Sequence, residues 1–313
     1  MQFAYYLRAG KTYPKMIELA RLAENLGYYG CFLNDHVMGL GADPAEEYLE
    51  AWTAMTGIGM QTTKLRVGQI VLFNSLRNPA FLAKSISTLD NMTNGRYELM
   101  IGAGWNEPEY SGYDLIEGGR GMPSAKERVD RFEESLKILR AMLDNEITNF
   151  KGKFWNLKNA VNSPQPLQKD MKIHVGCKGP RMMSVTADLA NGINLTARTV
   201  PDILGLIERF RSIVENKGKH LGSYEISGFG GVYIGKDEAS AKNLAKTRAS
   251  QQKISTKEVL RDQLVGTAEQ VTMKLEKLKS NGMQKMIVWI GLDDSMTDHP
   301  LEYFKDNCIS SLV

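Results

Sequence analysis

A histidine beside a carboxylate is the first feature of this sequence that could perform chemistry. Asn34-Asp35-His36 directly follows an apolar run. Histidine titrates near neutral pH, so this pair could orient a bound ring or exchange a proton with it. The alternative is an aspartate that caps a helix beside a solvated histidine. We predict His36 as a catalytic residue and Asp35 as a cofactor-binding residue.

A second segment combines glycines, a tryptophan and a carboxylate. It runs Gly102-Ala103-Gly104-Trp105-Asn106-Glu107. Glycine lets the backbone approach a ligand closely, and a carboxylate can act as a general acid or base. A Gly-x-Gly pattern alone occurs in many turns, so the prediction depends on the adjoining Trp-Asn-Glu. We predict Glu107 as catalytic and three residues as cofactor-binding: Gly104, Trp105 and Asn106.

A phosphate could bind where an apolar run leads into Gly176-Cys177-Lys178-Gly179-Pro180-Arg181. Backbone N–H groups, the positive end of the following helix and the two cationic side chains could converge on one anion. The segment lacks the GxxxxGK[ST] spacing of a P-loop. The alternative is a tight turn between a strand and a helix. We predict all six residues as cofactor-binding.

An apolar platform is predicted at Ile70-Val71-Leu72-Phe73-Asn74. A flat tricyclic ring could lean against it, and Ile70, Val71 and Asn74 are the predicted contacts. The alternative is ordinary barrel core.

Several classes of protein and site are disfavoured. The net charge is +3 over 313 residues, with the basic residues scattered, so nucleic-acid binding is not expected. No stretch approaches the roughly 20 apolar residues of a membrane span, and no signal peptide is evident. Three separated cysteines and isolated histidines offer no metal-ligand spacing, and GxSxG is missing. These features predict a reducing, cytoplasmic protein without metal.

The elements that must position these residues alternate regularly. Short apolar runs rich in β-branched or aromatic residues alternate with stretches of helical period, a pattern typical of βα units around a parallel sheet. Eight such runs predict closure into a (β/α)8 TIM barrel, whose reactive face lies at the strand C-termini. The runs are Phe3–Leu7, Gly30–Leu33, Leu65–Leu72, Tyr97–Ile101, Ile173–Gly176, Gly192–Thr196, Gly228–Ile234 and Met286–Ile290.

Helices are marked by proline, glycine and capping patterns between these runs. Pro14–Leu26, Pro79–Met92 and Ser124–Leu143 show helical periodicity, and Thr267 with Gln270 forms a capping-box pattern. Two stretches, Trp105–Pro123 and Asn149–Asp170, are predicted insertions, the second containing a hairpin. No linker marks a boundary, so residues 1–313 are predicted to form one domain.

Together these motifs resemble the luciferase-like superfamily of flavin- and coenzyme F420-dependent oxidoreductases. The resemblance covers most of the chain in the expected order. Its motifs are Asp35-His36, Arg77-Asn78-Pro79, Asn94-Gly95-Arg96, Gly102 to Tyr110, Phe150 to Phe154, Ala160 to Pro166 and Val265 to Val271.

The resemblance implies a luciferase-like barrel with insertions, often a homodimer, and a non-prolyl cis peptide near Ile70-Val71 under the cofactor ring. It implies an oxidoreductase (EC 1) with Asp35 and His36 near the ring, Glu107 as a proton donor or polar contact, and Gly176–Arg181 around the phosphate. Leu40 stands where sugar-phosphate-oxidising members carry tryptophan, which argues against that substrate.

Three functions follow as hypotheses. The Gly-Ala-Gly-Trp-Asn-Glu-Pro-Glu-Tyr and Ala-Val-Asn-x-Pro-x-Pro segments favour a coenzyme F420-dependent oxidoreductase that transfers a hydride to or from a small organic substrate. The alternatives are an FMN-dependent monooxygenase using reduced flavin and O2, and a non-catalytic flavin-binding barrel. Substrate specificity is expected in the loops Gly39–Glu47, Gly112–Pro123 and Leu292–Pro300.

Overall fold

The computed structural model describes residues 1–40, 43, 45–294 and 296–312. Two of the predicted specificity loops, 39–47 and 292–300, contain residues 41, 42, 44 and 295, which lie outside the described residues. The strands are β1 Gln2–Leu7, β2 Gly30–Leu33, β3 Arg66–Gln69, β4 Leu72–Phe73, β5 Tyr97–Gly102, β6 Ile147–Lys151, β7 Asn156–Val161, β8 Ile173–Gly176, β9 Gly192–Thr196, β10 Glu225–Ile234, β11 Val265–Gly266 and β12 Lys285–Leu292.

Helices follow most of the strands, as the alternating pattern predicts. Among the described residues, no helix is long and apolar enough to span a membrane. The helices are α1 Tyr13–Asn25, α2 Ala51–Gln61, α3 Pro79–Met92, α4 Glu107–Gly112, α5 Ala125–Asp144, α6 Pro180–Leu189, α7 Val200–Asn216, α8 Glu238–Gln252, α9 Thr256–Asp262, α10 Ala268–Ser280 and α11 Pro300–Asn307.

The sheet confirms the predicted barrel. Pairing follows the order β11-β10-β12-β1-β2-β3-β5-β8-β9, and β9 also pairs with β10, which closes the path. Across the described residues, the eight predicted runs coincide with barrel strands. These strands are buried on both faces, as β2 and β5 show throughout their length, which explains their largely apolar sequences.

The third strand differs from its prediction. The run Leu65–Leu72 is divided into β3 and β4, both paired in parallel with β5. A cis peptide bond between Ile70 and Val71 lies between the two pieces, at the predicted position. The strand therefore bulges where the apolar platform was expected.

Backbone contacts group the chain into two compact units. Unit 1 comprises Met1–Tyr6, Leu22–Gly30 and Asn194–Val313, and unit 2 comprises Leu7–Arg21 and Cys31–Ile193. The boundaries cut through β1, β2 and β9, so strands of the barrel belong partly to each unit. The single domain expected from the sequence stays a prediction.

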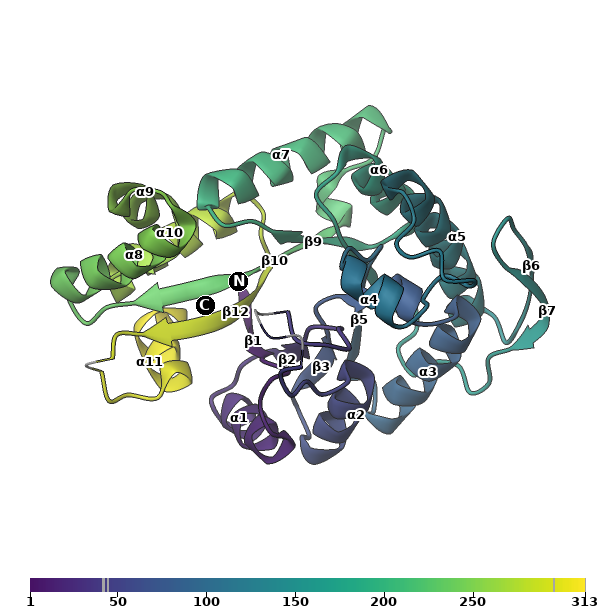
Figure 1. Cartoon of the computed structure of the whole chain (residues 1–313), viewed down its shortest axis with the longest axis horizontal. Coiled ribbons are helices and arrows are strands. Elements are labelled where there is room, and N and C mark those ends of the chain that lie inside the picture. The colour runs from purple at the N-terminus through teal and green to yellow at the C-terminus, as the bar shows by residue number, and fades with distance from the viewer. Residues whose placement is uncertain (41–42, 44, 295, 313) are drawn as a thin grey trace. The chain divides into compact units, whose positions relative to one another are not determined.

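Unit 2 contains every predicted site residue. Figure 1 shows its helices α2, α3 and α5 outside strands β2, β3 and β5, with the hairpin β6–β7 beyond α5. The hairpin confirms the predicted insertion at residues 149–170. The insertion at 105–123 contains the short helix α4, which was not predicted.

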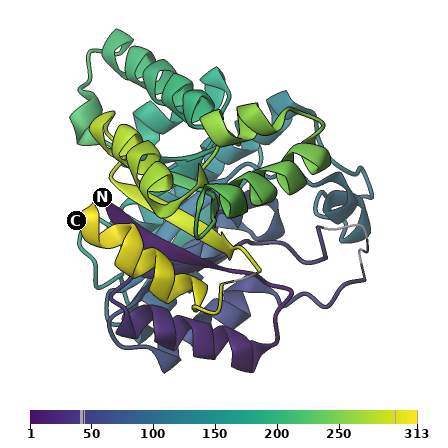
Figure 2. The same ribbon diagram turned by 90° about the vertical axis from the view of Figure 1, so that its left-hand side faces the viewer.

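Unit 1 carries both ends of the described chain. Figure 2 shows α11 lying along β1, and the rings of Phe3 and Phe304 meet edge to face with centroids 5.4 Å apart. The predicted capping box is present at the start of α10, where Thr267 and Gln270 each bind the other's backbone N–H.

Candidate active site

His36 lies after β2 and is held by a carboxylate from α4. Its Nδ1 lies 2.7 Å from Glu109 Oε2, and the Val37 amide donates to Glu109 Oε1 at 2.7 Å. The Glu109 side chain is 0% exposed. Burial alone would raise the pKa of Glu109, but the hydrogen bonds from His36 and Val37 outweigh burial and lower it. An ionised Glu109 can only accept a hydrogen bond, so His36 donates this one from Nδ1.

Aromatic rings surround this histidine. The His36 ring lies edge to face with Trp105, with centroids 5.6 Å apart, and with Phe73 at 6.2 Å. Trp105 is largely exposed. The imidazole therefore contacts one buried ring, Phe73, and one ring at the surface, Trp105.

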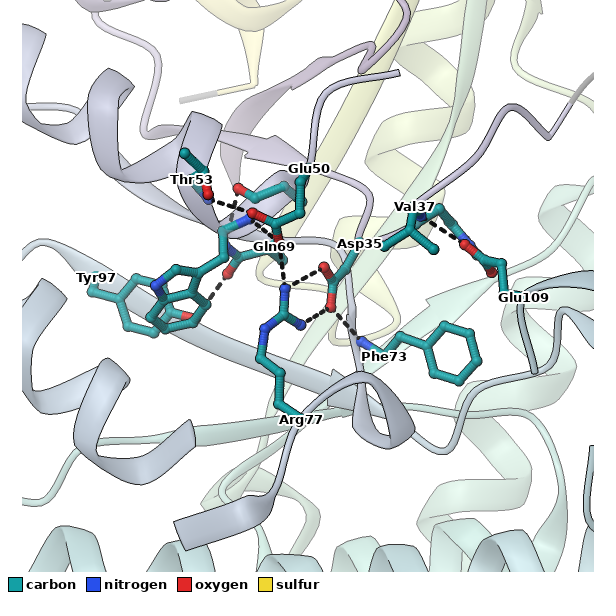
Figure 3. Close-up of polar contacts among 12 residues, drawn as sticks. Asp35, Val37, Glu50, Thr53, Gln69, Phe73, Arg77, Tyr97 and Glu109 are labelled. Atoms are coloured by element: carbon teal, nitrogen blue, oxygen red, sulfur yellow. Dashed lines mark hydrogen bonds and ion pairs between the residues drawn. The ribbon is translucent and has the colours of Figure 1, made fainter. Parts of the chain in front are cut away.

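Asp35 joins the same loop to the end of β4. Its Oδ2 accepts from the Phe73 amide at 2.8 Å and from Arg77 Nη1 at 2.6 Å, as Figure 3 shows. Arg77 Nη2 also donates to Asp35 Oδ1 at 3.0 Å and to Glu50 Oε1 at 2.6 Å. Asp35 therefore fixes the backbone around His36, and its predicted contact with a cofactor stays a prediction.

Glu50 completes this ion-pair network from the start of α2. Its carboxylate accepts from the amides of Trp52 and Thr53 at 2.9 and 2.8 Å. Burial acts to raise the pKa of Glu50, yet the two amides and Arg77 lower it overall. One arginine thus links the loop after β2 to α2 and to the start of α3.

The bulge packs against two glycines at neighbouring strand ends. A Cβ on Gly102 would lie 2.9 Å from Val71 Cγ2, and a Cβ on Gly176 would lie at the same 2.9 Å. Val71 therefore occupies the space that side chains on β5 and β8 would need. Gly104 is as restricted, because its φ is +81° and a Cβ would lie 1.9 Å from Phe73 Cε2. The structure thus brings Val71, Gly104 and Gly176 together in one unit.

The predicted phosphate segment opens helix α6. Gly179 is its N-cap without a side-chain hydrogen bond, and a Cβ there would meet nothing within 4 Å. Lys178 is exposed, whereas Arg181 forms an ion pair with Asp130 and donates to the Lys126 carbonyl at 3.2 Å. Burial raises the pKa of the Cys177 thiol to about 12.

Comparison with known proteins decides the family. The luciferase-like monooxygenase family matches residues 1–288. The chain belongs to this family. Pyrimidine monooxygenase RutA of Variovorax paradoxus is 29% identical over 183 residues, covering 56% of this chain and 47% of the relative. An F420-dependent glucose-6-phosphate dehydrogenase of Nakamurella multipartita is 26% identical over 226 residues. The match covers 71% of this chain and 64% of the relative.

The luciferase-like fold is equally clear from solved structures. An F420-dependent secondary alcohol dehydrogenase, in complex with an F420-acetone adduct, has a TM-score of 0.81 at 19% identity and covers 98% of this chain and 97% of its own. EDTA monooxygenase from Chelativorans sp. BNC1 has a TM-score of 0.81 at 14% identity, and the match covers 100% of this chain and 93% of that structure's chain. The chain spans about half to two thirds of the curated relatives named above. These luciferase-like relatives are oxidoreductases using F420 in some cases and monooxygenases in others.

Within this luciferase-like site, the sequence prediction missed Glu109. The predicted Glu107 is exposed, and its Oε1 accepts from Ser111 Oγ at 2.7 Å. Residues two apart on a helix point in different directions, so α4 presents one of these two glutamates to His36. Pro108 within the first turn is a helix-start signal that could have revealed this difference. A catalytic role for Glu107 stays a prediction.

Proposed function

We propose that this protein is a coenzyme F420-dependent oxidoreductase that transfers a hydride between the deazaflavin and a carbon of a small organic alcohol or carbonyl compound. The F420-dependent relatives and the Gly102 to Tyr110 segment support this choice. When bound, F420 would supply or accept the hydride. The protein's own residues would bind, orient and move the proton.

The observation that carries the proposal is the contact between His36 and buried Glu109. Glu109 engages Nδ1, so Nε2 is the ring nitrogen available to a substrate. As an alcohol carbon loses its hydride, its hydroxyl proton passes to Nε2, and the reverse reaction returns it to the new oxygen. Trp105 beside His36 would shield this exchange from water.

The residues after β8 fit the phosphate of such a cofactor. The N-terminus of α6 lacks a side-chain cap, Gly179 leaves open space, and Lys178 contributes positive charge. These are groups that favour a phosphate anion. F420 and FMN share the ring-ribityl-phosphate body, so this segment suits either.

Equilibrium binding of F420 and FMN to the purified protein, measured side by side, tests the cofactor. Preference for F420 supports the proposal. Preference for FMN favours the alternative, a monooxygenase using reduced flavin and O2, to which relatives such as the pyrimidine monooxygenase point. Binding of neither would contradict both.

Turnover with F420 and a short secondary alcohol, followed by the deazaflavin absorbance, tests the role of His36. His36→Asn should lower kcat by about 10²- to 10⁴-fold while F420 binds nearly as well, because general-base catalysis contributes that much. Equal kcat in both proteins would remove His36 from the proposal. F420 binding without turnover of any alcohol or carbonyl compound would favour a non-catalytic flavin-binding barrel.

We also propose a homodimer formed through α2 and α3. Met60 on α2 is 54% exposed, and Phe81 and Met92 on α3 are 68% and 46% exposed. Phe81 and Met92 lie on one face of α3, since 11 residues make about three turns. A contiguous patch of exposed apolar side chains marks an interaction surface, and we propose that these residues form one. Light scattering should give twice the chain mass, and Phe81→Glu should give monomer.

A further inference from the structure

Unit 2 contains a polar cavity whose lining includes Asn74 among the predicted cofactor contacts but is otherwise made by residues outside that set. Its volume is about 490 Å³, within the range of small-molecule sites. Residues from four separate segments line it, including Asn74, Arg120, Arg131, Lys153 and Trp155. Asn74 directly follows Phe73 at the end of β4, so the cavity adjoins the candidate active site.

Three cations at one end of this cavity share few acidic partners. Arg131 Nε and Arg120 Nη2 both donate to Glu127 Oε1, at 2.9 and 3.3 Å. That bond uses one Arg131 donor and leaves the Nη groups as further donors on a residue that lines the cavity. Lys153 supplies a third positive charge, and Glu117 is the acidic residue in the lining.

The other cation of the lining is balanced separately. Arg77 binds Asp35 and Glu50, so its charge is compensated within that network. The positive surplus therefore lies with Arg120, Arg131 and Lys153.

A buried carboxylate fixes the hairpin tip that carries Lys153. Glu134 of α5 accepts from the backbone amides of Lys153, Phe154 and Trp155, at 2.9, 3.0 and 2.8 Å. The guanidinium of Arg131 lies 4.3 Å from the centre of the Phe154 ring, and Lys153 Nζ lies 5.0 Å from it. Arg131 and Lys153 therefore both lie against the Phe154 ring, and Arg120 is linked to Arg131 through Glu127.

We propose that this cavity binds an oxyanion, a phosphate or carboxylate group of a small molecule, through Arg120, Arg131 and Lys153. Arginine presents forked donors that match such groups, and lysine adds a point charge. The group could belong to a separate anionic ligand or to the anionic end of a molecule held in the adjoining active site. The excess positive charge in the lining of this cavity does not depend on which cofactor the barrel binds.

Calorimetric titration with inorganic pyrophosphate, at constant ionic strength, tests the site. We expect saturable binding to the full chain and about a tenfold loss in affinity for Lys153→Ala or Arg120→Gln, as expected for loss of one charge-assisted bond. Lys151→Ala on the same hairpin should stay within twofold, and Lys178→Ala tests whether pyrophosphate binds instead at the predicted phosphate segment. Both variants remove one positive charge but no residue of the cavity lining.

Three outcomes would overturn the proposal. They are no saturable binding to the unaltered protein, an equal loss for Lys151→Ala and Lys153→Ala, or a loss confined to Lys178→Ala. Once pyrophosphate binding is established, its effect on F420 affinity distinguishes the sources. Competition indicates the anionic end of an active-site ligand, and simultaneous binding indicates a separate anion. Failure of F420 to bind would leave the pyrophosphate result standing.

Discussion

His36 Nδ1 contacts Glu109 Oε2 at 2.7 Å across 73 positions of sequence. The folded protein lowers the pKa of Glu109 from the ordinary 4.5. Its ionised form therefore stabilises the fold above about pH 4.5, and this contribution is lost as the pH falls through the lowered pKa. The contact thus makes stability depend on pH.

Glu109→Gln should accordingly reduce the free energy of unfolding at pH 7, and the deficit relative to the unaltered protein should shrink below pH 4.5. Urea unfolding at pH 7 and pH 3.5 measures this. The exposed Glu107→Gln is the matched control and should change little at either pH. A deficit of the same size at both pH values would contradict the expectation.

Arg77→Gln should destabilise the protein by about 3 kcal/mol, because it leaves the buried Asp35 carboxylate without its charge partner. Arg8→Gln removes an exposed arginine that lies 3.6 Å from Glu46 and should cost under about 1 kcal/mol. Chemical unfolding of both variants gives the comparison. Similar losses for the two would show that the Asp35 pair is not specially stabilising.

Gly104→Ala should lower stability by about 1 to 3 kcal/mol through backbone strain and displacement of Phe73. Gly112→Ala is the control, because a Cβ there meets no heavy atom within 4 Å and its φ is not in the left-handed region. Melting temperatures of the two variants measure the difference. An unchanged Gly104→Ala protein would mean that Phe73 moves freely.

Glu134→Ala should cost about 2 to 4 kcal/mol, because three backbone amides lose one buried acceptor. Its neighbour Glu133 makes an i,i+4 pair with Lys137 at 2.8 Å, and Glu133→Ala should cost a few tenths of a kcal/mol. Hydrogen exchange at residues 153–155 provides a local measurement. Unchanged protection there would contradict the role given to Glu134.

Cys177 should resist alkylation in the native state. Burial raises its pKa to about 12, so at pH 8 almost no thiolate is present to react. Iodoacetamide followed by peptide mass spectrometry should find slow modification of the native protein and fast modification in urea. Rapid labelling of native Cys177 would show that the loop opens readily.

The barrel could be predicted from the sequence because its strands are buried on both faces. Continuous apolar runs such as Gly30–Leu33 record that burial directly, and glycine, proline and capping residues marked the intervening helices. The sequence placed Arg77 in a family motif but gave no role for its side chain, because its partners Asp35 and Glu50 lie 42 and 27 positions away. Pairings of that kind depend on three-dimensional proximity, which no local spacing records.

Glu109 shows the same limit at the candidate site. The sequence drew attention to Glu107 because it follows Gly-x-Gly-Trp-Asn. Which glutamate reaches His36 depends on the turn of α4, a six-residue helix too short to show an apolar periodicity. The bulge at Ile70-Val71 came from family resemblance, and local composition gave no sign of it.

Val71 between Gly102 and Gly176 has a consequence for protein engineering. A methyl group added to either glycine would press on the same valine, so the two positions cannot be enlarged independently. A library that varies them should include Val71→Ala in the same clones, because the smaller residue frees room for one new side chain.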